Sequence, residues 1–250
     1  MCRRGIALQA GRCWSSSRNS AALLAVLLLT ACGGHTAQPK IQGPYLQGKL
    51  QYWLVRPHGK PHAVVVLLHG LSNYTGEQLK QWQLHLAEQG DDVIFPRYEQ
   101  PAGDPIARIT IAVSVEQALD ALGRPKVPLV LLGHSRGGRL AVEAATELHP
   151  QLVIAIFPGL LNPSFELPTN LGLIPKSTQI FLYSGDTDTA VGTTGVQQLL
   201  RRLHAGGRTA HVGVIHSRPG YDATHDSVYR TNAAARAALW APVDKLIASS

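Results

Sequence analysis

Cysteine is nearly absent from this sequence of 250 residues. Its three cysteines are Cys2, Cys13 and Cys32, and the chain beyond residue 32 contains none. That part of the chain therefore has no disulfide, no thiolate metal site and no cysteine nucleophile. Any chemistry performed there must come from other side chains.

Acidic residues are missing from the first 31 positions, which carry four arginines. The formal net charge of +7 depends strongly on this segment, because the rest of the chain has 19 basic and 16 acidic residues, a net of +3. No run of basic residues is interleaved with aromatic ones. The charge pattern therefore gives no reason to expect a nucleic-acid partner.

The apolar stretch near the N-terminus is too short to cross a membrane. AALLAVLLLTA, residues 21–31, has 11 residues, whereas a spanning helix needs about 20. Arginines before a short apolar stretch are typical of a secretory signal peptide. We therefore expect a signal peptide over residues 1–31, a tether over 32–44 and one domain over 45–250.

The residues that follow this stretch, Leu29-Thr30-Ala31-Cys32, resemble the lipobox of bacterial lipoproteins. The resemblance implies cleavage before Cys32, lipidation of that cysteine and a membrane anchor in the bacterial cell envelope. Gly33 after the cysteine, in place of an aspartate, implies the outer membrane, facing the periplasm. The alternative is an ordinary cleaved signal with an incidental cysteine.

Apolar runs and amphipathic stretches alternate after residue 45. The runs predict strands over 63–70, 92–98, 127–133, 152–159, 178–185 and 210–216, with a hairpin or edge strand over 46–57. The amphipathic stretches predict helices over 75–90, 106–122, the segment after Ser135, 193–207 and 232–248. We expect Thr75 to cap the first of these helices, Gly90 to end it, and Pro242 to kink the last. The alternation predicts an α/β fold with a mostly parallel, doubly wound sheet.

The central motif is Gly133-His134-Ser135-Arg136-Gly137, which joins a predicted buried strand to a predicted helix. A Gly-x-Ser-x-Gly turn in this context is too tight for side chains at the glycines, and it lifts the serine above the sheet edge. The start of a helix also favours developing negative charge. We therefore expect Ser135 to be a nucleophile; a structural loop serine is the alternative.

An oxyanion hole needs two N–H donors aimed at the same oxygen. The backbone N–H of Arg136 is one by its position, and we expect its side chain to form a surface ion pair. The second candidate is the N–H of Leu71, in the sequence LLHGLSN after an earlier strand. His69 in that sequence is expected to brace the loop.

At this point residues 45–248 resemble an α/β-hydrolase, and the elbow GHSRGG resembles that of chlorophyllases and some lipase-like esterases. The resemblance implies a triad in the order Ser, acid, His. The acid is expected in FLYSGDTDTAV, residues 181–191, where the family pattern Gly-x-x-Asp-x-x-Val selects Asp188 over Asp186.

The base is expected in a loop between the last strand and the last helix. His225 occupies that place, whereas His216 ends an apolar run and reads as part of a strand. An imidazole suits the role because its pKa lets it accept and return a proton near neutrality. The other histidines show no metal-ligand spacing, so no metal and no cofactor are expected.

The residues between two of the predicted strands, 160–177, contain three prolines and a glycine, which leaves no room for a large helical cap. The leucines and the phenylalanine there either line an acyl pocket or cover the sheet: Leu160, Leu161, Phe165, Leu167 and Leu171. We expect a carboxylesterase acting on a small-molecule or lipid-like ester through an acyl-enzyme. The alternatives are another acyl hydrolase or transferase (amidase, thioesterase or peptidase), or a non-catalytic lipoprotein that binds ligands.

Overall fold

The computed structural model describes residues 38–250 except 72, 100–103 and 163–167. Cys32, the expected signal peptide, Phe165 and Leu167 lie outside these residues. Within the described part of the chain, no helix is both long enough and apolar enough to cross a membrane.

The described residues form one eight-stranded sheet with the order β1-β2-β4-β3-β5-β6-β7-β8. The strands are β1 (Ile41–Tyr45), β2 (Tyr52–Val55), β3 (Val64–Leu68), β4 (Asp92–Pro96), β5 (Leu129–His134), β6 (Leu152–Ile156), β7 (Gln179–Gly185) and β8 (His211–Ile215). The β1–β2 and β2–β4 pairs are antiparallel, and all later pairs are parallel. The predicted α/β class and mostly parallel sheet are confirmed.

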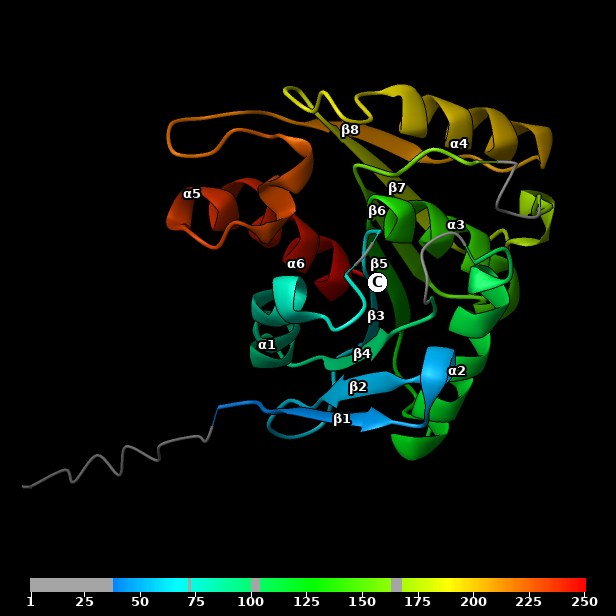
Figure 1. Cartoon of the computed structure of the whole chain (residues 1–250), viewed down its shortest axis with the longest axis vertical. Coiled ribbons are helices and arrows are strands. Elements are labelled where there is room, and N and C mark those ends of the chain that lie inside the picture. The colour runs from blue at the N-terminus through cyan, green and yellow to red at the C-terminus, as the bar shows by residue number, and fades with distance from the viewer. Residues whose placement is uncertain (1–37, 72, 100–103, 163–167) are drawn as a thin grey trace, which may run out of the picture. The chain divides into compact units, whose positions relative to one another are not determined.

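Helices cover both faces of the sheet (Figure 1). One face carries α2 (Ala107–Ala121), α3 (Arg136–Leu148) and α4 (Thr194–Ala205); the other carries α1 (Lys80–Glu88), α5 (Ala233–Ala235) and α6 (Ala241–Ala248). Alternate residues of β3 belong to different cores, since Val64 and Val66 face one and Val65 and Leu67 the other. Burial on both faces explains why the predicted strands read as continuous aliphatic runs.

The chain enters the sheet at Ile41, earlier than the expected boundary at residue 45. Ile41 pairs with Val55 and Tyr45 with Tyr52 in the antiparallel β1–β2 ladder. Part of the segment expected to be a tether is therefore an edge strand. The hairpin or edge strand expected over 46–57 is present as β2, which pairs with β1 as a hairpin and is not at the edge of the sheet, because β4 lies on its other side. A short 3-10 turn, η1 (Gly48–Leu50), precedes it.

Two helix details differ from the sequence-based expectation. Thr75 is not the cap of its helix: Gly76, with a φ of 75°, precedes a 3-10 turn, η2 (Glu77–Leu79), which leads into α1. The C-terminal helix, expected to kink at Pro242, contains a π-helical turn, η5, directly before that region, over Arg236–Trp240. Because Pro242 has no N–H to donate to the previous turn and its ring crowds that turn, the backbone adjusts N-terminal to it.

Candidate active site

Ser135 stands on a strained turn between β5 and α3. Its φ of 54° and ψ of −125° lie outside the regions that non-glycine residues ordinarily adopt. The flanking glycines are required by space, because a Cβ on Gly133 would lie 2.2 Å from the Gly137 carbonyl oxygen, and one on Gly137 would lie 2.3 Å from that of His69. The predicted tight turn is confirmed, and the serine side chain projects from it.

The structure brings together the three side chains selected from the sequence. His225 Nε2 lies 2.8 Å from Ser135 Oγ, and His225 Nδ1 lies 2.9 Å from Asp188 Oδ2. The other Asp188 oxygen accepts hydrogen bonds from the backbone N–H groups of Ala190 (2.9 Å) and Val191 (3.1 Å). The carboxylate is therefore held by the turn that follows β7 while it faces the imidazole.

Asp188 is suited to remain ionised. Burial by itself would raise the pKa of its carboxyl group, but the hydrogen bonds from His225, Val191 and Ala190 outweigh burial and leave the pKa below its ordinary value. An ionised acceptor at this position fixes the ring proton of His225 on Nδ1, which leaves Nε2 free to accept a proton from Ser135.

The two rival residues lie elsewhere. Asp186 accepts hydrogen bonds from the Ser217 hydroxyl (2.6 Å) and the Ser217 backbone N–H (2.9 Å). His216 contacts Asp186 at 3.3 Å, and its side chain is 73% exposed. Asp186 therefore braces one loop against another, as expected of the rejected candidate.

Two glycines approach the backbone N–H and side-chain positions next to Ser135. A Cβ on Gly159 would lie 2.9 Å from the Arg136 nitrogen, so a side chain there would crowd this N–H. A Cβ on Gly70 would lie 3.4 Å from the Ser135 Cβ, which places the loop that continues to Leu71 beside the serine. Arg136 is the first residue of α3, where a helix offers its N–H groups no acceptor of its own.

Solved structures resemble this chain along most of its length. An α/β hydrolase enzyme, MGS-M1, from a deep-sea metagenome library superposes with a TM-score of 0.62 at 14% identity, covering 85% of this chain and 98% of that one. Esterase B from Lactobacillus rhamnosis, with a tributyrin phosphonate inhibitor, superposes with a TM-score of 0.61 at 17% identity, covering 84% and 86%. The chain has the α/β-hydrolase fold.

A comparison of sequences finds a shorter match to a lipase. Monoglyceride lipase from Rattus norvegicus is 31% identical over an alignment of 127 positions that covers 45% of this chain and 40% of the lipase. The match therefore covers less than half of either protein. No protein-family model matches the sequence.

One expectation about the surroundings of Ser135 was wrong. The side chain of Arg136 is not in a surface ion pair but is 10% exposed, with Nε 3.0 Å from a carboxylate oxygen of the fully buried Glu99. Its Nη2 also donates to the Asp104 carbonyl oxygen at 3.1 Å. The side chain turns inward because a buried carboxylate stands behind the elbow, and a buried charge needs a partner.

His69 braces the oxyanion-side loop, as expected. Its ring nitrogens lie 2.6 Å from the Gly70 carbonyl oxygen and 2.8 Å from that of Arg97, and its ring stacks on Tyr98 at 4.1 Å. Burial lowers the pKa of His69 to about 4, against the raising effect of these two contacts. Burial thus favours the neutral ring, which has a single N–H and can donate to only one of these two carbonyl oxygens.

Leu71 and Leu160 each follow a glycine that approaches Ser135 or Arg136, and both leucines are exposed, unlike Leu171. Leu71 is 56% exposed and Leu160 is 47% exposed, whereas Leu171 is 2% exposed and belongs to the core beside α3 and α4. Leu171 therefore covers the sheet. The described residues of this segment hold one short 3-10 turn, η3 (Leu171–Leu173), and show no large cap.

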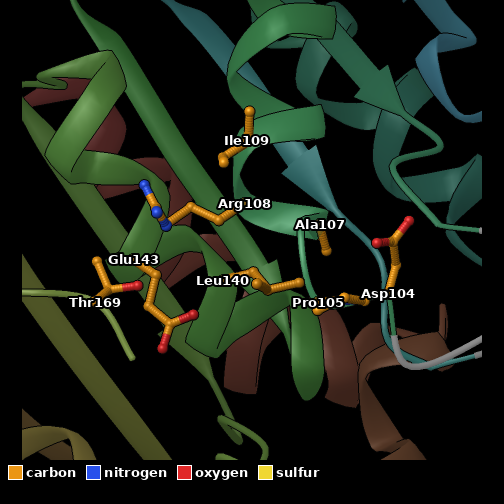
Figure 2. Close-up of a pocket in the computed structure, with 8 residues that line it drawn as sticks. All are labelled: Asp104, Pro105, Ala107, Arg108, Ile109, Leu140, Glu143 and Thr169. Atoms are coloured by element: carbon orange, nitrogen blue, oxygen red, sulfur yellow. The ribbon is translucent and has the colours of Figure 1, made fainter. Parts of the chain in front are cut away.

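A separate small pocket lies between α2 and α3 (Figure 2). Its lining consists of Asp104, Pro105, Ala107, Arg108, Ile109, Leu140, Glu143 and Thr169. Its charged side chains form the ion pairs Lys49–Asp104, Arg108–Glu147, Arg139–Glu143 and Glu143–Arg202. These charges are mutually compensated, so the pocket is better explained as part of the packing between helices. Among the described residues, no group of three or more His, Cys, Asp or Glu side chains is arranged to hold a metal.

No role for His134 is predicted from the sequence, although this residue directly precedes Ser135. Its Nε2 lies 2.9 Å from the His225 carbonyl oxygen, and its Nδ1 lies 3.3 Å from the Tyr229 hydroxyl. The signal available in the sequence was its place next to the nucleophile candidate, but its partners lie about 90 residues further along the chain. Only the fold reveals the contact.

Proposed function

We propose that the protein is a serine carboxylesterase that acts through Ser135, His225 and Asp188. The observation that carries the proposal is the continuous pair of contacts from Ser135 Oγ to His225 Nε2 at 2.8 Å and from His225 Nδ1 to Asp188 at 2.9 Å. The esterase and lipase names among similar proteins support ester hydrolysis. A protein that only binds ligands would not need these three side chains in contact with one another.

In the proposed reaction, His225 Nε2 takes the proton from Ser135 Oγ as that oxygen attacks the ester carbonyl. The N–H groups of Arg136 and Leu71 hold the oxygen of the tetrahedral intermediate. His225 then returns the proton to the departing alcohol, which leaves an acyl group on Ser135. A water molecule, deprotonated by the same imidazole, releases the carboxylic acid and restores the serine.

We infer that the substrate is an uncharged ester with an apolar acyl chain. Leu71 and Leu160 each follow a glycine that lies against Ser135 or Arg136, and both leucines are exposed. They supply apolar surface on either side of the proposed reacting centre. The absence of a large cap among the described residues fits an open site that admits small or lipid-like esters.

The direct test is hydrolysis of p-nitrophenyl butyrate by the wild type and by Ser135→Ala. Loss of the nucleophile should lower kcat at least about 10³-fold. Ser249→Ala is the matched control, because Ser249 lies at the exposed C-terminal end of the chain, and it should keep the wild-type rate. An inert wild type, or a Ser135→Ala variant as active as the wild type, would overturn the proposal.

We also propose that Cys32 carries a lipid and holds the domain to the bacterial outer membrane, on its periplasmic side. The support is the lipobox-like sequence that ends in Cys32 after the short apolar stretch. Cys32→Ala should move the protein from the membrane pellet to the soluble fraction. Cys13→Ala, inside the proposed signal peptide, should leave it in the pellet. Sedimentation of the Cys32→Ala variant with membranes would contradict this proposal.

A further inference from the structure

His134 is the point at which three loops meet. Its side chain belongs to the buried set, at 3% exposure. A Cβ on Gly70 would lie 3.2 Å from His134 Nδ1 and 3.6 Å from the Tyr229 hydroxyl. The turn that carries Ser135, the loop after β3 and the segment that carries His225 therefore come together around one imidazole.

Both ring nitrogens of His134 contact the base segment, the 3-10 turn η4 (His225–Tyr229). Nε2 lies 2.9 Å from the His225 carbonyl oxygen, and Nδ1 lies 3.3 Å from the Tyr229 hydroxyl. A carbonyl oxygen only accepts, so Nε2 must donate its proton to His225, and the Tyr229 hydroxyl must donate to Nδ1. A single neutral tautomer of His134 satisfies both contacts.

The direction of these hydrogen bonds persists over a wide pH range. Burial, together with the nearby His225 imidazole, lowers the pKa of His134 to about 3. His134 therefore keeps its neutral form at pH values where an ordinary imidazole gains a proton. The hydrogen bond to the His225 carbonyl oxygen therefore keeps its direction over this range.

A second anchor holds the base segment independently. Trp82 Nε1 donates to the Val228 carbonyl oxygen at 2.9 Å, and Ser227 Oγ lies 2.9 Å from the Tyr221 hydroxyl. Loss of the His134 contact therefore leaves the segment attached to α1 and to the preceding loop. The contact with His134 is the one that ties this segment directly to the residue before Ser135.

We propose that His134 is a positioning residue, which sets the distance between Ser135 Oγ and His225 Nε2 by donating a hydrogen bond to the backbone of His225. This inference rests on the proposed function, since it concerns the same pair of reacting groups. His134 is covalently joined to Ser135 and hydrogen-bonded to His225, so its side chain links the backbone of the nucleophile to the backbone of the base. Small displacements of a base away from its proton donor reduce the rate of proton transfer steeply.

The test compares two variants of similar size, His134→Gln and His134→Met. Both side chains are long and unbranched, but only the Gln amide can donate a hydrogen bond from near the position of Nε2. With p-nitrophenyl butyrate, we expect His134→Met to lower kcat about 10- to 100-fold while KM stays within about 3-fold of wild type. His134→Gln should keep kcat within about 5-fold of wild type.

Equal values of kcat for the Gln and Met variants would overturn the inference, because a residue that merely fills space responds to shape alone. If His134→Met does not fold, Tyr229→Phe is the second test, because it removes only the hydroxyl group that donates to His134 Nδ1. A fall in kcat of about 3- to 10-fold at unchanged KM supports the inference. An unchanged kcat overturns it. A wild type without esterase activity overturns the proposed function as well. An active wild type with equal Gln and Met variants overturns this inference alone.

Discussion

Asp186 and Asp188 differ in what they bind, although only two positions separate them. Asp188 faces His225 and is 6% exposed, whereas Asp186 binds Ser217 on the outside of the same turn. The family pattern around Gly185 and Val191 favours Asp188, and both of these flanking residues take part in the turn that holds it. The Val191 N–H binds Asp188, and a Cβ on Gly185 would lie 2.0 Å from the Ala223 carbonyl oxygen.

Neutralising these two aspartates should therefore have unequal effects. Asp188→Asn presents an amide to His225, which favours the wrong ring tautomer, so kcat should fall about 10³- to 10⁴-fold. Asp186→Asn should retain kcat within about 5-fold, since it faces no reacting group. Steady-state hydrolysis of p-nitrophenyl butyrate measures both. Equal losses in the two variants would show that the acid was wrongly assigned.

Side-chain contacts between residues that are far apart in the sequence could not be predicted from it. Arg136 was expected at the surface because its position after Ser135 says nothing of Glu99, which the fold buries behind it. The bond from His134 to His225 is of the same kind, since the two residues are 91 positions apart. Motifs identify residues whose role follows from local backbone geometry, and they miss roles that arise when distant loops pack together.

At the scale of elements, the turn between β5 and α3 requires glycine at position 137, and the Gly-x-Ser-x-Gly motif predicts this requirement. A Cβ on Gly137 would meet three backbone atoms of Leu68 and His69 within 2.6 Å. Neither β3 nor α3 can move away without losing its packing against the sheet. This close approach of strand and helix is what places Ser135 beside the loop that follows β3.

Gly137→Ala should consequently destabilise the protein by about 3 kcal/mol or more, or prevent folding. Gly123→Ala is the matched comparison. A Cβ there would meet nothing within 4 Å, and only its φ of 77° opposes the change, so about 1 kcal/mol is expected. Urea denaturation followed by circular dichroism gives both values. A Gly137→Ala variant no less stable than Gly123→Ala would contradict the assigned geometry.

The elements themselves were predictable where hydrophobic runs were long and bounded by glycine. The run that became β3 is buried along its whole length, and Gly90, with a φ of 101°, follows α1 as its predicted stop. The ends that depend on other elements were not predictable. β1 is defined by pairing with β2, and the wide turn over Arg236–Trp240 depends on how the chain accommodates Pro242.

At the scale of the whole molecule, buried histidines make stability depend on pH. Burial is the main reason that the pKa values of His69 and His134 are lowered to about 4 and about 3. Between these pKa values and the ordinary histidine pKa of about 6.5, the unfolded chain binds more protons than the folded one. Stability is therefore lost as the pH falls through this range. Asp91 acts in the opposite sense, because burial raises its pKa to about 6 and the folded state gains a proton first.

The two histidines outweigh the one aspartate, so the free energy of unfolding should be about 3 kcal/mol lower at pH 4.5 than at pH 7.5. Urea denaturation at the two pH values measures the difference. His134→Gln should reduce the loss to below about 1 kcal/mol, because the one remaining histidine, His69, is then largely offset by Asp91. Equal or greater stability at pH 4.5 in the wild type would show that these imidazoles are not held neutral.

The most direct test of the central claim is to locate the site at which a fluorophosphonate reacts. The reagent forms a covalent bond with a serine oxygen that has been activated by a neighbouring base. Digestion of the labelled protein and mass spectrometry of its peptides should find one phosphonyl adduct, on Ser135, and Ser135→Ala should take up no label. An adduct on another residue, or equal labelling of Ser135→Ala, would contradict the assignment of the nucleophile.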